Sequence, residues 1–287
     1  MSKELELAID DGHRKEQVLK SRVVSSFPAM HRIGAIALNT FRETVRDRVL
    51  YNLLLFAIIL VIASIFVSEL SINEESKFIT DLGLSAVLVF GTIISIFIGV
   101  GLVFKEIEKR TVYFLLSKPV HRHEFIIGKY LGLCLTLLLN SATMVLGTML
   151  ALVYVNRGIT PLLRAVPPAA FLIYLELALL VSVALLFSSF TTPMLSALFS
   201  FAAFVIGNFS NDFGVAGSMS HSAPLRSILA ALYYLLPNLS NFSFISEASH
   251  GAIVPWRMTL SAIVYTIIYV AILLSATVVV FRARSFK

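Results

Sequence analysis

Charged and apolar residues alternate in blocks along one internal stretch of the chain, from Lys105 to Tyr130. The stretch opens with Glu106, Glu108 and Arg110, continues as an apolar run, and breaks at Ser117-Lys118-Pro119. A loop that only connects two helices is short and polar, whereas a charged turn beside an apolar face is typical of a docking surface for a partner protein. The alternative is a helix that rests on lipid headgroups, with its basic residues on anionic lipid.

Glu176 is the second residue that could carry chemistry, because it is an ionisable side chain inside a long apolar run. A charged acidic residue at the centre of a membrane span costs roughly 2.5–3.5 kcal/mol, so such a residue is a functional candidate by default. Counted from Ala169, where the apolar run starts, Glu176 lies seven residues in, which favours a place toward the outer leaflet. The alternatives are a hydrogen bond to a neighbouring span, a substrate or proton site, and a place near the interface.

No pattern in the sequence predicts catalysis or metal binding by this chain. The only Gly-Lys pair, Gly128-Lys129, is followed by Tyr130, so the phosphate-binding G-x-x-x-x-G-K-[ST] motif is absent. The His123-Glu124 pair lacks the second histidine of a zinc protease motif, since position 127 is isoleucine. We therefore expect no catalytic residue, no metal ligand and no cofactor on this chain, and interpret Glu124 as part of a weak helix cap.

The composition requires a membrane, because 57% of the 287 residues are hydrophobic and only 14% are charged. Soluble domains have about 45–50% apolar and about 25% charged residues. Apolar runs of about 20 residues can satisfy their backbone in lipid only as helices. We predict an all-α membrane protein whose domain from 49 to 281 holds six transmembrane helices, at 49–67, 82–104, 131–155, 169–190, 194–213 and 258–281.

The segments outside the spans set the predicted orientation. Residues 1–30 form a polar extension without a signal peptide, and residues 282–287 form a basic tail. Apolar residues recur at helical spacing over 31–48, which predicts an amphipathic interfacial helix with Arg32, Arg42 and Glu43 on its other faces. Since 18 of the 23 Lys and Arg residues fall on the side of the termini, the positive-inside rule places both termini in the cytoplasm.

Two further features concern how the helices pack. Gly91, Ser95 and Gly99 recur at a spacing of four on the second predicted span, where small residues permit a tight helix contact within the chain or across a dimer. The segment 222–251 is apolar but broken by Pro237 and therefore too short to span. It is predicted either to dip into the outer leaflet as a re-entrant pair of short helices or to lie flat at the interface.

Several of these patterns resemble one known family. Glu106-x-Glu108-Lys109-Arg110-Thr111, then Phe114-Leu115-Leu116-Ser117-x-Pro119-Val120, then Glu124-Phe125-x-x-Gly128-Lys129 resemble the coupling segment of ABC-2 type permeases, the membrane subunits of ABC transporters with an exporter-like fold. The stretch 40–48 resembles the family's amphipathic helix, 185–193 its turn between spans four and five, and 235–238 its re-entrant segment. The resemblance covers the chain from Ile33 to its end.

The resemblance implies a non-catalytic permease subunit in the bacterial inner membrane. Its coupling residues would be Glu106, Glu108, Arg110, Thr111, Leu115 and Pro119. Its partners would be two cytoplasmic ATPase subunits, which bind ATP and magnesium, and a second permease that is a copy or a homologue. No nucleic acid is expected. An exporter is favoured because no large outer loop is present. The alternatives are an ATPase-coupled complex that remodels the envelope or transmits force, and a secondary transporter without an ATPase.

Overall fold

The computed structural model describes residues 29–46, separate residues between 51 and 66, and the ranges 74–108, 122–212 and 236–283. At 102–108, 122 and 281–283 it describes the backbone alone. Every regular element in these ranges is a helix, as the sequence predicts. The helices are α2 (Ala29–Val45), α4 (Glu75–Glu108), α6 (Arg122–Asn156), α7 (Pro161–Ser188), α8 (Pro193–Asn208), η1 (Ser240–Phe242), α11 (Ile245–Ser249) and α12 (Trp256–Ala283).

Four of the described helices are long and apolar enough to cross a membrane. Their apolar parts cover 75–101, 123–156, 161–188 and 256–280, which correspond to predicted spans two, three, four and six. The fifth, α8, has 16 residues and is about 24 Å long, which is shorter than the roughly 30 Å hydrocarbon core. The first predicted span, 49–67, lies largely outside the described residues, so the count of six stays a prediction.

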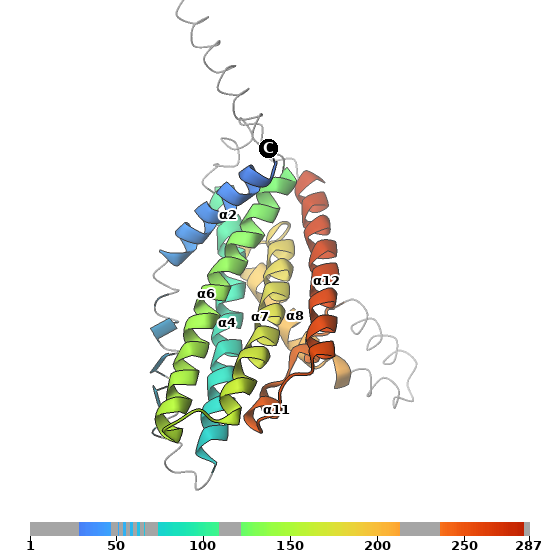
Figure 1. Ribbon diagram of the computed structural model, residues 1–287. Helices are drawn as coiled ribbons and strands as arrows, with labels where there is room; N and C mark the ends of the chain where they lie inside the picture. Colours follow the sequence, from blue (N-terminus) through green and yellow to red (C-terminus); the bar gives the residue numbers. More distant parts are fainter. Residues whose placement is uncertain are drawn as a thin grey trace, which may run out of the picture.

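Helix α7 occupies the centre of the bundle (Figure 1). It contacts α4, α6, α8 and α12, and 78% of an 18-residue apolar stretch within it is buried. Its fully buried residues include Leu172, Leu179 and Leu185. Helix α12 differs sharply, because only 17% of the corresponding 18-residue stretch is buried. An apolar helix with most of its surface uncovered needs hydrocarbon around it, so this contrast agrees with a membrane environment.

The start of α7 differs from the prediction. The expected span begins at Ala169, after Pro167 and Pro168, but the helix begins at Pro161 and continues through both prolines. Proline at the first helical position costs little because the amide there has no helical partner anyway. Prolines further inside remove hydrogen bonds, yet membrane helices tolerate them where neighbouring groups satisfy the freed carbonyls. Packing against the other helices therefore overrides the local break that the sequence indicates.

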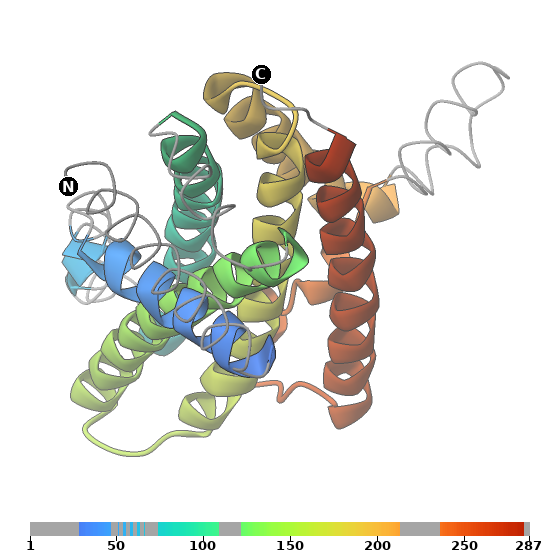
Figure 2. The same ribbon diagram turned by 90° about the horizontal axis from the view of Figure 1, so that it is seen from above.

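The alternating directions of the helices give the bundle two distinct ends. One end brings together α2, the start of α6 and the end of α12, whereas α11 lies at the other end (Figure 1). Seen from the first end, α2 crosses over α6 (Figure 2). We call these the α2 end and the α11 end. The α2 end is the one predicted to face the cytoplasm, because it holds the start of α6, which belongs to the segment Lys105–Tyr130.

Candidate functional site: a charged junction and a polar cluster

The first part of the site is the contact between α2 and α6, which we name the α2–α6 junction. Gly128 and Gly132, four residues apart on α6, are in close contact with α2. A Cβ atom at Gly128 would lie 2.7 Å from the Cβ of Ile36, and one at Gly132 would lie 2.5 Å from the carbonyl oxygen of Ala37. The predicted apolar stripe of α2 therefore packs on protein, because glycines four residues apart let two backbones approach closely.

Two ion pairs flank this contact. Arg32 Nη2 on α2 donates to Glu124 Oε1 on α6 at 2.7 Å, and the Glu124 side chain is only 1% exposed. Lys129 Nζ lies 3.9 Å from Glu43 Oε2 and 5.7 Å from the centre of the Phe125 ring. Arg32 was expected on another face of α2, and this expectation is wrong. The residue is four positions before Ile36 and so shares its face of the helix.

The predicted coupling residues precede α6, one of the two helices of the junction, in the sequence. Glu106 and Glu108 belong by their backbone to the end of α4. Arg110, Thr111, Leu115 and Pro119 lie outside the described residues, as does His121 of the predicted helix cap. Since α6 begins at Arg122, the segment that carries these residues leads directly into the first turn of the helix that α2 crosses.

The second part of the site surrounds Glu176. This residue lies fifteen positions after the start of α7 and twelve before its end, so it is near the middle of the helix. The helix begins eight residues before the predicted span, because the prolines before Ala169 do not end it, so Glu176 lies fifteen residues into the helix and not seven. Glu176 is 1% exposed and is therefore covered by protein, not lipid.

Glu176 connects α7 to the end of α8. Asn208, the last residue of α8, donates from Nδ2 to Glu176 Oε1 at 3.0 Å and to the carbonyl oxygen of Phe204 at 3.1 Å. The geometry matches the alternative in which Glu176 bonds a neighbouring helix. Interhelical hydrogen bonds of this kind in membranes contribute about 0.6 kcal/mol on average.

Residues after Pro237 fold back onto the end of α8. The backbone N–H of Leu239 donates to the carbonyl of Gly207 at 3.0 Å, and the backbone N–H of Asn238 donates to the Tyr265 hydroxyl at 2.9 Å. The Asn238 side chain donates to Asn211 Oδ1 at 2.9 Å. These contacts give partners to backbone groups at a helix end, as an interrupted helix in a membrane requires.

We name this set the polar cluster: Glu176, Asn208, Asn211, Asn238 and Tyr265. The returning residues 236–251 contain η1 and α11, and Phe242 within them is fully buried. They contact α4 and α7, so the described part of the predicted re-entrant segment is docked against the bundle. The remainder of that segment, before Leu236, lies outside the described residues.

The small residues of α4 face α7. A Cβ atom at Gly91 would collide with the Leu177 side chain, and one at Gly99 would lie 3.0 Å from the Cβ of Ala184. The Ser95 hydroxyl donates to the Gly91 carbonyl at 2.7 Å, within its own helix. The contact therefore lies within one chain and depends on size alone, not on interhelical hydrogen bonds.

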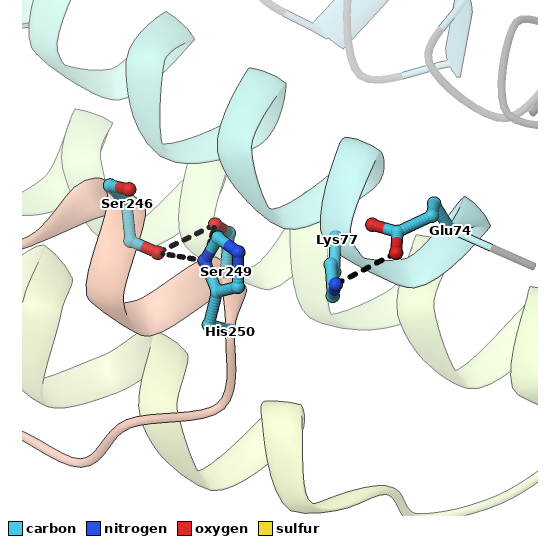
Figure 3. Close-up of polar contacts among 5 residues, drawn as sticks. All are labelled: Glu74, Lys77, Ser246, Ser249 and His250. Atoms are coloured by element: carbon cyan, nitrogen blue, oxygen red, sulfur yellow. Dashed lines mark hydrogen bonds and ion pairs between the residues drawn. The ribbon is translucent and has the colours of Figure 1, made fainter.

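Two separate sets of local polar contacts lie at the start of α4 and on α11 (Figure 3). Lys77 Nζ in the first turn of α4 donates to Glu74 Oε1 at 2.8 Å, and the Ser249 hydroxyl on α11 donates to the Ser246 carbonyl at 2.8 Å. His250 Nδ1 lies 2.7 Å from the same carbonyl. Each of these contacts joins residues at most four positions apart, so both sets shape local turns.

Sequence reasoning missed several residues of the site, including Asn211 and Tyr265 of the polar cluster. Glu124 was interpreted as a cap, and Asn208 and Asn238 were assigned no function. Glu124 and Arg32 are 92 positions apart, so no local pattern could join them. A usable signal exists for Asn208, because an amide at the end of an apolar helix needs a polar partner at membrane depth.

Comparison with known proteins now adds to this geometry. No curated protein matches the chain. Residues 34–286, which make up most of the chain, match the family described as ABC-2 family transporter protein. The match begins within α2, two residues after Arg32, and continues through α12, so it includes the rest of both parts of the site and agrees with the long apolar helices. The chain is an integral membrane protein and belongs to the ABC-2 family of transporter proteins.

Proposed function

We propose that this chain is the permease subunit of an ATP-driven ABC exporter, which couples ATP hydrolysis on partner chains to movement of a substrate across the membrane. Membership of the ABC-2 family supports a membrane permease of an ABC transporter. Two cytoplasmic ATPase subunits would bind ATP and magnesium, and a second permease, a copy or a homologue, would complete the membrane part. The α2 end would face the cytoplasm of a bacterial inner membrane.

One observation carries the coupling proposal. The predicted coupling segment leads into α6 at Arg122, and Glu124, two residues later, is paired with Arg32 of α2. Gly128 and Gly132 then hold α2 against α6 over the next two turns. A push on the segment would therefore move α6 and α2 together as one body. The permease responds to the ATPase only if its two arrangements bind the ATPase with different affinity.

The first experiment is purification of the tagged full-length protein from its native membrane in mild detergent. We expect a cytoplasmic chain with a G-x-x-x-x-G-K-[ST] motif to co-purify in fixed ratio. Isolation of the permease alone, under conditions that preserve other membrane complexes, would argue against an ATPase partner and favour an ATPase-independent transporter.

The second experiment tests the coupling segment by charge reversal. We expect Glu106→Lys with Glu108→Lys to abolish permease-stimulated ATP turnover while membrane insertion remains normal. Glu74→Lys with Glu75→Lys is the matched control, because it makes the same charge change near the opposite end of α4. Equal loss of turnover in both variants, or no loss in either, would remove the segment from the coupling role.

A further inference from the structure

A groove runs between α6 and α12 and opens along the side of the bundle. Its volume is 670 Å³. Its walls are residues from the start of α6 and the second half of α12, among them His123, Ile127, Leu131, Thr266, Ala271 and Val279. Most of these side chains are apolar, so the groove offers a surface for hydrocarbon and not for a polar solute.

The dimensions of the groove fit one alkyl chain. The lining residues on α12 extend from Thr266 to Val279, which are thirteen positions apart and so about 20 Å apart along a helix. Half of a bilayer's hydrocarbon core is about 15 Å thick. The groove therefore begins at the α2 end and reaches the middle of the membrane. Thr266 marks its inner limit, because it is the lining residue of α12 that lies farthest from the α2 end.

The basic residues near the groove indicate which type of lipid would bind in it. Its outer mouth is at the α2 end, where His123 and Val279 line it. The backbone of Arg122 directly precedes His123 at the start of α6, and the backbone of Arg282 lies three positions after Val279 near the end of α12. Basic residues at a membrane surface attract anionic lipid by about 1 kcal/mol each. An anionic headgroup at this mouth would place its acyl chain along the apolar walls.

We propose that the groove between α6 and α12 is a binding site for an anionic phospholipid of the leaflet at the α2 end, with one acyl chain lying between Ile127 and Val270. This proposal does not require that the protein transports a substrate. It would tie α12, which has little contact with the other helices, to the first turns of α6. Those are the same turns that α2 crosses.

The test uses the full-length protein in phosphatidylcholine vesicles that contain a minor fraction of phosphatidylglycerol with a photoactivatable group on one acyl chain. We expect adducts concentrated on residues 127–131 of α6 and 270–279 of α12. The same photoactivatable chain on phosphatidylcholine should give at least about fivefold fewer adducts, the factor that corresponds to about 1 kcal/mol from a single basic residue. Equal labelling by both lipids, or adducts spread evenly over the exposed faces, would overturn the proposal.

Two neighbouring substitutions provide the matched comparison. Ala271→Phe fills the groove and should reduce the groove adducts about tenfold. Ile272→Phe changes a residue that does not line the groove and is 60% exposed, so labelling should be unchanged. Labelling that is unchanged in both variants would overturn the proposal, because the labelled acyl chain would then lie outside the groove.

A second copy of the protein is the competing occupant. The chain has one cysteine, Cys134, and it is buried, so Ser275→Cys introduces a reactive thiol into the groove wall without a competing one. We expect no disulfide-linked dimer when membranes that contain this variant are oxidised. Efficient dimer formation through position 275 would show that protein occupies the groove and would overturn the lipid assignment.

Discussion

The α2–α6 junction and the polar cluster both join helices through polar side chains, but they use different chemistry. The junction has full charges, with Arg32 and Glu124 at 2.7 Å. The cluster has one carboxyl group, Glu176, and otherwise amides, a phenol and backbone groups. The junction lies at an end of the bundle, where headgroups and water are near, whereas the cluster lies near the middle of α7.

This difference follows from the cost of charge at each depth. A charged group at the centre of a bilayer is expensive, and its cost falls toward the interface. An ion pair near the surface can be strong, because its partners are shielded from water by protein while the free-energy cost of burying their charges there is smaller than at the bilayer centre. Amide hydrogen bonds near the centre are weaker but cost less to bury. We therefore expect the junction to hold firmly and the cluster to hold loosely enough to rearrange.

The largest effect is expected from Glu124→Gln. Removal of one partner from a buried ion pair costs about 3–5 kcal/mol because the other charge is left without compensation. Since the Arg32 side chain is 16% exposed, we expect a loss at the lower end, about 3 kcal/mol. The measurement is the free energy of unfolding in detergent, together with protease cleavage of α2.

A double variant shows whether the loss comes from the unpaired charge. Arg32→Met combined with Glu124→Leu removes both charges and should recover at least half of the lost stability, since apolar replacements of a buried pair are often neutral. If instead the loss of stability in the double variant equals the sum of the losses in the two single variants, Arg32 and Glu124 act independently and their pairing does not hold the junction.

The next effect is expected at the polar cluster from Gly207→Ala. The new Cβ would lie 2.8 Å from the Pro237 carbonyl oxygen, which is backbone and cannot move alone. Overpacking of this kind costs about 1–3 kcal/mol. Gly101→Ala is the control, because among the described residues no atom outside the neighbouring backbone of its own helix lies within 4 Å of the added Cβ. It should stabilise α4 by about 0.5–1 kcal/mol.

Undocking of the returning segment can be followed separately. Ser249 is 4% exposed, so a cysteine there should react with a thiol reagent only when the segment leaves the bundle. We expect Ser249→Cys to be labelled faster in the Gly207→Ala background than in the Gly101→Ala background. The same rate in both backgrounds would mean that the contact at Gly207 does not hold the segment in place.

A smaller effect is expected from Glu176. Glu176→Leu removes its bond to Asn208, and we expect a loss of about 0.6 kcal/mol, the average for such bonds in membranes. Glu176→Gln keeps an oxygen that can accept the same bond and should cost less. If Glu176 serves packing alone, Glu176→Gln also retains normal ATP turnover and transport. Lost transport with normal assembly would assign it a substrate or proton role instead.

The sequence predicted more of the junction than of the cluster. The apolar stripe of α2 at Ile33, Ile36 and Ala37 has a regular helical spacing, and helical spacing determines which face is buried. The partner of that face could not be predicted, because α2 and α6 are far apart in the chain. The pairing of Arg32 with Glu124 follows only once α2 is placed on Gly128 and Gly132.

The cluster was less predictable because the sequence does not show where helices end in a membrane. Apolar residues continue up to Phe209 and Phe213, so the pattern favours a longer α8 than the 16 residues observed. Its end is fixed by the return of Leu239 to the Gly207 carbonyl, a contact between distant residues. Pro167 and Pro168 likewise suggested a later start for α7, and that moved the expected depth of Glu176.

The smallest effect is expected from Glu43→Gln, at the second ion pair of the junction. The Glu43 side chain is 46% exposed while that of Lys129 is 3% exposed, so the carboxylate that the substitution removes is solvated, and the 3.9 Å between the charged atoms is at the limit of direct contact. Exposed pairs contribute about 0–1 kcal/mol and weaken as salt increases. We therefore expect a loss of about 0.5 kcal/mol at low salt that disappears at high salt, measured by unfolding under the same conditions as Glu124→Gln. A loss as large as that of Glu124→Gln would show that the junction depends on its total charge, and burial would then no longer explain why one pair outweighs the other.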